Sequence, residues 1–99
     1  MSLQGETREK TRIKIRQPKH YRVIMHNDDF TSMEFVVEIL IDIFHKESAE
    51  AERLMLLVHQ SGKAAGGEYP YDIAVTKVQK AAARAKQEGF PFRMTVEEI

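Results

Sequence analysis

The chain has 99 residues, of which 42% are hydrophobic, and its 15 Lys and Arg residues balance its 15 Asp and Glu residues. This length supports one domain with a modest core, too small for a large buried active site, and the zero net charge excludes a chain-wide field that recruits nucleic acid or membranes. Because it has no cysteine, no apolar leader and no membrane-spanning apolar run, we expect a soluble domain in a reducing, cytoplasmic compartment.

The first nineteen residues differ from the rest of the chain in charge and in pattern. They carry six basic and two acidic residues, a net charge of six minus two or +4, so that about −4 remains on residues 20–99. They also lack apolar periodicity, and we therefore predict a flexible basic N-terminal arm over residues 1–19 and a folded core over residues 20–99. The basic residues of the arm are Arg8, Lys10, Arg12, Lys14, Arg16 and Lys19.

The first predicted element is a strand over residues 20–26 (HYRVIMH). Tyr21, Val23 and Met25 alternate with the other residues, which is the period of a strand that buries one face. The sequence Asn-Asp-Asp follows and ends the strand. Such side chains often bond to their own backbone, so this acidic turn has a purely structural interpretation as well as a functional one.

A helix is predicted next, with Thr31 as its N-cap and its end at about Lys46. Glu34 lies three residues after Thr31 and completes a capping box. Between Met33 and Phe44, only Glu34, Glu38 and Asp42, which recur every four residues, interrupt its apolar sequence. We therefore expect this to be the central helix of the fold, with these three residues on its solvent side.

Two further helices are predicted after it. The first has Ser48 as its N-cap and ends before Gly62, and the second has Asp72 as its N-cap and ends near Glu88. Each is expected to bury one face against the sheet. The residues predicted to face inward are Leu54, Met55, Leu57 and Val58 in the first helix and Ile73, Val78, Ala81, Ala82 and Ala85 in the second.

Two short strands complete the expected fold. Residues 63–69 (KAAGGEY) form a weak strand, because glycines carry no side chain to pack, and Phe92, Met94 and Val96 alternate in a final strand. The resulting order is β-α-α-β-α-β. We therefore expect an α+β fold in which a three-stranded antiparallel sheet packs against three helices.

The sequence contains few residues arranged for catalysis or metal binding. Asp28, Asp29, Glu34 and His59 are candidate ligands, yet no EF-hand spacing and no H-E-x-x-H pair is present. No G-x-S-x-G motif and no cysteine nucleophile occurs either. We therefore expect no cofactor, no metal and no enzymatic activity, and we favour a binding function. A metal- or nucleic-acid-binding regulator is a weaker alternative that rests on the acidic turn and the basic arm.

Three stretches of the chain together resemble one known family. HNDDFTSMEFVVEIL, ERLMLLVHQSGKA and DIAVTKV follow one another as in the ClpS family, adaptors of the ATP-dependent Clp protease, and the resemblance covers roughly residues 18–98. It implies a fold similar to the C-terminal domain of the ribosomal stalk protein. It also implies a non-catalytic adaptor, expected to be a monomer, that binds proteins with a free, bulky apolar first residue (Leu, Phe, Tyr or Trp). Such an adaptor delivers them to the ClpA unfoldase and the ClpP peptidase in the bacterial N-degron pathway.

The resemblance also implies roles for particular residues. Docking on the unfoldase is implied to involve Asp72 and Lys77, and Met33 is implied to screen out β-branched first residues. The residues implied to bind the substrate are Asn27, Asp28, Asp29 and His59 for its α-amine and Thr31, Met33, Val36, Met55, Val58 and Phe92 for its first side chain.

The sequence departs from the family pattern in several places. Asp72 replaces a common Glu, Ser32 a common Pro and Phe92 a common Leu, and Gly-Gly-Glu-Tyr stands where a more hydrophobic stretch is usual. These departures leave a second hypothesis open. In that hypothesis the chain is a divergent ClpA-binding modulator or inhibitor, with weak or narrowed delivery of substrates.

Overall fold

The computed structural model describes residues 19–99, which form three strands and three helices. In chain order these are β1 (His20–His26), α2 (Met33–Asp42), α3 (Ser48–Ser61), β2 (Lys63–Pro70), α4 (Tyr71–Glu88) and β3 (Arg93–Glu98). The predicted order β-α-α-β-α-β and the α+β class are therefore confirmed. The predicted basic arm lies outside the described residues, apart from Lys19.

The sheet has β1 at its centre. This strand pairs antiparallel with β2 on one side and with β3 on the other, which gives the order β2-β1-β3. Val23 and Met25 are fully buried and Tyr21 packs against the same core, so the predicted alternation of β1 is confirmed. The pairing with β2 shifts between Val23 and Ile24, where Gly66 is the extra residue of a bulge.

The glycines of β2 allow an aromatic ring to lie against the strand. A Cβ atom on Gly67 would lie 2.5 Å from the hydroxyl oxygen of Tyr69, so a larger residue there would displace the ring. Burial raises the pKa of Tyr69, and its ring packs against Phe44 with 6.1 Å between the ring centres. The segment predicted to be a weak strand is therefore held by the packing of its aromatic residue onto glycine backbone.

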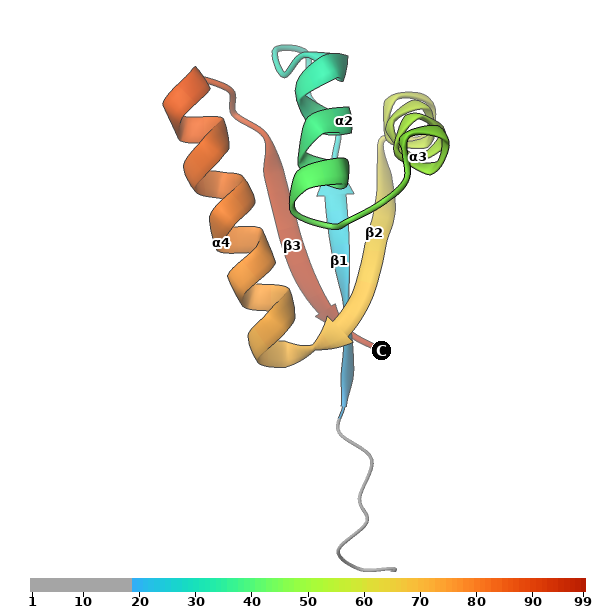
Figure 1. The fold of residues 1–99 in the computed structure, drawn as a ribbon, viewed down its shortest axis with the longest axis vertical. Helices are drawn as coiled ribbons and strands as arrows, with labels where there is room; N and C mark the ends of the chain where they lie inside the picture. The colour runs from blue at the N-terminus through green and yellow to red at the C-terminus, as the bar shows by residue number, and fades with distance from the viewer. Residues whose placement is uncertain (1–18) are drawn as a thin grey trace, which may run out of the picture.

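The three helices lie over the sheet. In Figure 1, α2 runs along β1, α4 lies on the β3 side and α3 lies on the β2 side. α2 is the central helix that its apolar sequence predicted, although Ile41 remains 37% exposed. The largest fully buried side chains belong to β1 and α2 and are Phe35, Met25, Ile39, Leu40 and Val23.

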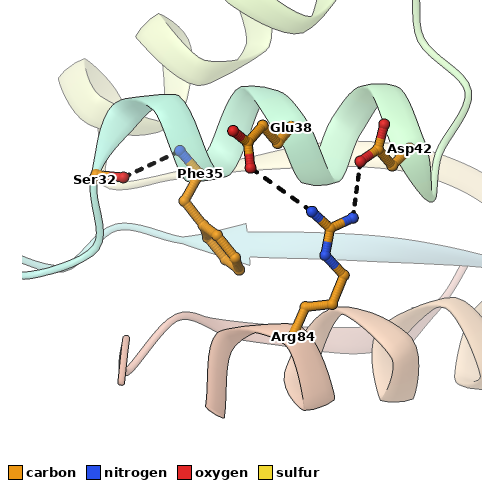
Figure 2. A network of polar contacts seen from close by, with 5 residues as sticks. All are labelled: Ser32, Phe35, Glu38, Asp42 and Arg84. Carbon is orange, nitrogen blue, oxygen red and sulfur yellow. Dashed lines mark hydrogen bonds and ion pairs between the residues drawn. The ribbon is translucent and has the colours of Figure 1, made fainter. Parts of the chain in front are cut away.

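α2 begins and ends at residues other than those predicted. Ser32 rather than Thr31 is its N-cap, because the Ser32 hydroxyl oxygen accepts a hydrogen bond from the Phe35 N–H at 3.1 Å (Figure 2). The helix ends at Asp42, one turn earlier than predicted, and His45 beyond it has a left-handed φ of 56°. Adjacent Ser and Thr residues are both favourable caps, so the pattern located this start only approximately.

α3 and α4 also begin next to their predicted caps. Glu47 rather than Ser48 precedes α3, and Pro70 rather than Asp72 precedes α4, in both cases without a side-chain hydrogen bond to the helix. The fixed φ of proline suits the start of a helix, which a search for Ser, Thr, Asn and Asp overlooks. The predicted ends are confirmed, because both closing glycines adopt left-handed φ angles of 89° and 75°.

Three residues predicted to face inward are exposed. Leu57 is 38% exposed, Ile73 is 44% exposed and Ala82 is also at the surface. These predictions were wrong because each helix buries only a narrow row of side chains, and the three residues lie beside those rows. The buried rows are Ala51, Leu54 and Val58 in α3 and Ala74, Ala81 and Ala85 in α4.

Arg84 of α4 joins α4 to α2. Its guanidinium donates a hydrogen bond to Asp42 at 2.9 Å and lies 3.7 Å from the carboxylate of Glu38 (Figure 2). Both acids lie on the solvent side of α2, as predicted, and about half of each side chain is exposed. Exposed ion pairs contribute about 0–1 kcal/mol each, so this contact orients the two helices more than it stabilises them.

Candidate functional site

A cavity of about 390 Å³ opens where β1 ends and α2 begins. Its walls come from the turn after β1, the first turns of α2, the second half of α3 and the residue before β3. The structure brings together around it all ten residues that the sequence assigned to substrate binding. These are Asn27, Asp28, Asp29, Thr31, Met33, Val36, Met55, Val58, His59 and Phe92.

Asp28 holds the turn between β1 and α2 in shape. Its Oδ1 accepts hydrogen bonds from the backbone N–H groups of Phe30 at 2.8 Å and Thr31 at 2.7 Å, and its Oδ2 accepts one from the Thr31 hydroxyl at 2.8 Å. Burial would raise the pKa of Asp28, but the hydrogen bonds from Thr31 and Phe30 outweigh it and hold the pKa below its usual value. The carboxylate is therefore ionised at neutral pH, and for this residue the structural interpretation of the acidic turn is confirmed.

Asn27 and Asp29 flank Asp28 and are exposed at the mouth of the cavity. The backbone N–H of Asn27 donates a hydrogen bond to the carbonyl oxygen of Gly62 at 2.9 Å. Because Gly62 closes α3, this bond ties the turn to the end of that helix.

His59 lies in the last turn of α3, exposed to solvent, and lines the same cavity. A neutral imidazole has one nitrogen that accepts a hydrogen bond. The rim therefore combines this ring with the amide of Asn27 and the carboxylates of Asp28 and Asp29. Such a set of acceptors suits a cation that carries several N–H donors.

The inner wall of the cavity is apolar. Its most buried members are Val36, Val58 and Phe92, which are 7%, 2% and 8% exposed. Met33 is 45% exposed at the rim. The Phe35 ring meets Phe92 from within the core, edge to face, with 6.1 Å between the ring centres. The cavity thus joins a polar mouth to an apolar interior.

Three residues that line the cavity were not predicted to do so, namely His26, Phe30 and Ser32. Phe30 is 77% exposed. The His26 ring lies 2.8 Å from the Thr95 hydroxyl through Nε2 and 3.4 Å from Arg93 through Nδ1, and burial together with nearby cations lowers its pKa. All three are sequence neighbours of the Asn-Asp-Asp turn, and that proximity is the signal that would have found them.

The two residues assigned to the unfoldase, Asp72 and Lys77, lie on α4 and do not line the cavity. Asp72 is exposed in the first turn of the helix. The Nζ atom of Lys77 donates a hydrogen bond to the carbonyl oxygen of Ile43 at 2.6 Å and lies 5.7 Å from the centre of the Phe44 ring. Burial lowers the pKa of Lys77. This lysine therefore has a role inside the fold, at the end of α2.

Replacing Lys77 with methionine is expected to lower the free energy of unfolding by about 1–3 kcal/mol, because the Ile43 carbonyl loses its charged donor. Urea unfolding measures the change. Lys80→Met, an exposed position on the same helix, is the matched control and should leave stability unchanged. Equal unfolding midpoints for the two variants would contradict the role given to Lys77.

Among residues 19–99, no three His, Cys, Asp or Glu side chains lie close enough together to hold a metal ion. The candidate ligands Asp28, Asp29, Glu34 and His59 therefore do not converge as a metal centre. In the same part of the chain, none of the helices has the length and apolar character that crossing a membrane requires.

Comparison with known sequences gives matches over most of the chain. A family model described as ATP-dependent Clp protease adaptor protein ClpS matches residues 16–95. The ATP-dependent Clp protease adapter protein ClpS of Nitratidesulfovibrio vulgaris (strain Miyazaki F) is 49% identical over 85 residues, which are 86% of this chain and 85% of that protein. The protein of the same name from Treponema denticola is 51% identical over 83 residues, which are 84% of this chain and 82% of that protein.

A solved structure is similar in fold as well as in sequence. Agrobacterium tumefaciens ClpS2, bound to L-phenylalaninamide, matches this chain with a TM-score of 0.81 and 36% identity, over 84% of this chain and 100% of that one. The family model, the relatives and the fold agree with the resemblance drawn from the three sequence stretches. The chain therefore belongs to the ClpS family, whose members are adaptor proteins of the ATP-dependent Clp protease and not enzymes.

Proposed function

We propose that this chain binds proteins whose free first residue is Leu, Phe, Tyr or Trp and delivers them to the ClpA unfoldase and the ClpP peptidase. One observation carries this proposal: a single cavity has hydrogen-bond acceptors at its mouth and a buried apolar wall inside. The ligand of Agrobacterium tumefaciens ClpS2, L-phenylalaninamide, supports it. That molecule combines a free α-amine with a large apolar side chain, which are the two features that the cavity would recognise.

The α-ammonium group of the substrate would bind at the mouth. A free N-terminus is a cation with three donors, and its ordinary pKa lies near 8. Asn27 offers a side-chain carbonyl oxygen, Asp29 a carboxylate and His59 a ring nitrogen. Asp28 already accepts three hydrogen bonds within the turn, so its contribution is negative charge, acting through space or through a bridging water.

The first side chain of the substrate would fill the apolar interior. Burial of a Leu- or Phe-sized group contributes roughly 1.5–3 kcal/mol, and each charge-assisted hydrogen bond to the amine contributes a similar amount. Part of this is offset by the cost of association, so a dissociation constant on the order of micromolar is expected. Neither half of the site suffices alone, which is why both the free amine and the bulky side chain are required.

Fluorescence anisotropy tests the proposal directly. Labelled peptides that begin with Leu, Phe, Tyr, Trp, Ile or Ala and are otherwise identical would be titrated with the protein, each with a free and an acetylated N-terminus. Binding is expected only for peptides with a free amine that begin with one of the four bulky residues without a branch at Cβ. Equal affinity for the Leu and Ala peptides, or for free and acetylated peptides, would refute the proposal.

Met33→Ala is expected to admit peptides that begin with Ile or Val, with a gain in affinity of at least about tenfold. Met33 stands half exposed at the rim of the cavity, where its flexible thioether would close over an unbranched Cβ and collide with a second γ-carbon. Anisotropy with Val- and Leu-first peptides measures the change. Leu56→Ala, an exposed site on α3 outside this cavity, is the control, and continued rejection of Val by Met33→Ala would count against this role.

His59→Ala is expected to weaken the binding of a Leu-first peptide by about tenfold, because the mouth loses a ring nitrogen that would accept a hydrogen bond from the substrate amine. Anisotropy at neutral pH measures the change. His59→Gln keeps a hydrogen-bond acceptor and should bind more tightly than His59→Ala. Equal affinities for the wild type and His59→Ala would overturn the role of His59.

The surface that would dock on ClpA lies on α4 and includes the exposed Asp72, with Lys77 beside the end of α2. Our proposal also includes action as a monomer in the cytoplasm, with residues 1–19 as a basic arm ahead of the binding domain. Degradation of a Leu-first reporter by purified ClpA and ClpP, with and without this protein, tests delivery. Faster degradation supports the adaptor. Peptide binding with slower degradation would instead favour the modulator or inhibitor.

A further inference from the structure

A second, smaller cavity adjoins the proposed substrate pocket. It measures about 120 Å³ and lies between α4 and β3. Within the described part of the chain, Phe92 is the one residue that lines both cavities. The other residues around the second cavity are Val78, Ala81, Ala82, Arg93 and Met94.

The second cavity exists because α4 carries small side chains beside β3. Ala81 and Ala82 reach only one carbon from the helix backbone, and Val78 lies one turn before them on the same side. Ala81 is 1% exposed, so the helix packs closely there and yet leaves space beside Phe92. Larger residues at these positions would fill that space.

Phe92 is placed to move between the two spaces. It is 8% exposed, it stands directly before β3 begins at Arg93, and its ring has the edge-to-face contact with Phe35. A phenylalanine side chain changes direction by rotation between staggered rotamers, which needs free volume beside it. An engineered cavity of about 150 Å³ admits benzene, so a space of about 120 Å³ takes most of a phenyl ring.

We infer that the Phe92 ring shifts into the cavity between α4 and β3 when a large first residue enters the substrate pocket, so that Ala82 limits the size of residue the pocket accepts. This inference rests on the proposed function and deepens it. We expect a Leu side chain to bind with Phe92 in its present position, and the larger indole of Trp to gain its room from the shift. The wall of the pocket is therefore adjustable, and its range is set by residues of α4 that do not touch the substrate.

The variant Ala82→Leu tests the inference, because its side chain would occupy the second cavity from an exposed helical position that leucine tolerates. Anisotropy with Leu-first and Trp-first peptides compares it with the wild type. The affinity for the Trp peptide is expected to fall at least about tenfold, while that for the Leu peptide stays within about twofold. Ala83→Leu is the matched control, since Ala83 is exposed on the same helix and lines neither cavity.

A second substitution separates ring movement from general damage. Phe92→Leu shortens the wall, so Trp binding should return in the Ala82→Leu, Phe92→Leu double variant, a coupling that a double-mutant cycle measures. If Ala82→Leu does not fold, Ala82→Met fills the same space with a more flexible side chain and carries the same expectation. Equal losses for both peptides, or no loss for either, would overturn the inference. Failure of the wild type to bind the Leu peptide would instead refute the proposed function and the inference with it.

Discussion

Asp28→Ala is expected to weaken the binding of a Leu-first peptide by about 100-fold, which corresponds to about 2.7 kcal/mol. The substitution removes a negative charge from the mouth of the cavity and also removes the acceptor of three hydrogen bonds that shape the turn. The free energy of unfolding should fall as well, by about 1–2 kcal/mol, because these bonds to an ionised group are partly exposed. Anisotropy measures the first change and urea unfolding the second.

Asp29→Ala is the control that separates the loss of negative charge at the mouth from the loss of the turn's hydrogen bonds. The hydrogen bonds of the turn go to Asp28, so Asp29→Ala should weaken binding by about tenfold and leave stability unchanged. The pH provides a second check. Because the folded state lowers the pKa of Asp28, its contribution to stability is complete above the ordinary value of about 3.9 and is lost as the pH falls through the lowered value. A stability difference between wild type and Asp28→Ala that persists at lower pH would contradict this assignment.

Phe35→Ala is expected to lower the free energy of unfolding by about 3–5 kcal/mol. Phe35 is 2% exposed in the centre of the core, and its ring meets Phe90 and Phe92 edge to face with 5.1 and 6.1 Å between the ring centres. Removing it leaves a cavity behind the wall of the substrate pocket, so Phe92 would lose its support. Such a loss is a large fraction of the about 5–15 kcal/mol that stabilises a typical domain.

Phe30→Ala provides the matched control for stability, because it removes the same side chain from a position five residues earlier that is 77% exposed. Its free energy of unfolding should stay within about 0.5 kcal/mol of the wild type. Urea unfolding of both variants measures the contrast. If the two substitutions lower the free energy of unfolding by the same amount, the core described around Phe35 is wrong.

The sequence predicted the core correctly wherever buried residues recur with a regular period. The alternation in β1 identified Val23 and Met25 as core residues, and the nearly continuous apolar sequence of α2 identified it as the central helix. Both signals are strong because one face of each element is covered along its whole length. The two closing glycines likewise fixed the ends of α3 and α4, since a left-handed backbone at a helix end favours glycine.

Details that depend on a single hydrogen bond were predicted less well. Ser32 and Thr31 are adjacent and chemically similar, and only the geometry shows that Ser32 caps α2 while Thr31 donates to Asp28. Lys77 and Ile43 are 34 residues apart, so no local pattern reveals that the lysine donates to that carbonyl. Leu57 and Ile73 were placed inside by their apolar character alone, which does not distinguish the buried row of a helix from its border.

Ten of the thirteen residues around the cavity were named through the family resemblance rather than through periodicity. Periodicity alone placed Met55 on the inward face of its helix, and it left the Asn-Asp-Asp turn with both a structural and a functional interpretation. The structure shows that these residues surround one cavity. No local sequence pattern could predict this, because they come from segments that are far apart in the chain.

The hydrogen bond from Asn27 to Gly62 has a thermodynamic consequence for the whole domain. It joins the turn after β1 to the end of α3, and Phe92 completes the cavity from a third segment, so the cavity exists only when distant parts of the chain are folded together. A ligand of the native state alone raises its stability by about 2.7 kcal/mol at a concentration 100 times the dissociation constant. Each bound substrate would therefore stabilise the folded state of the protein, whereas an unfolded copy would bind no substrate.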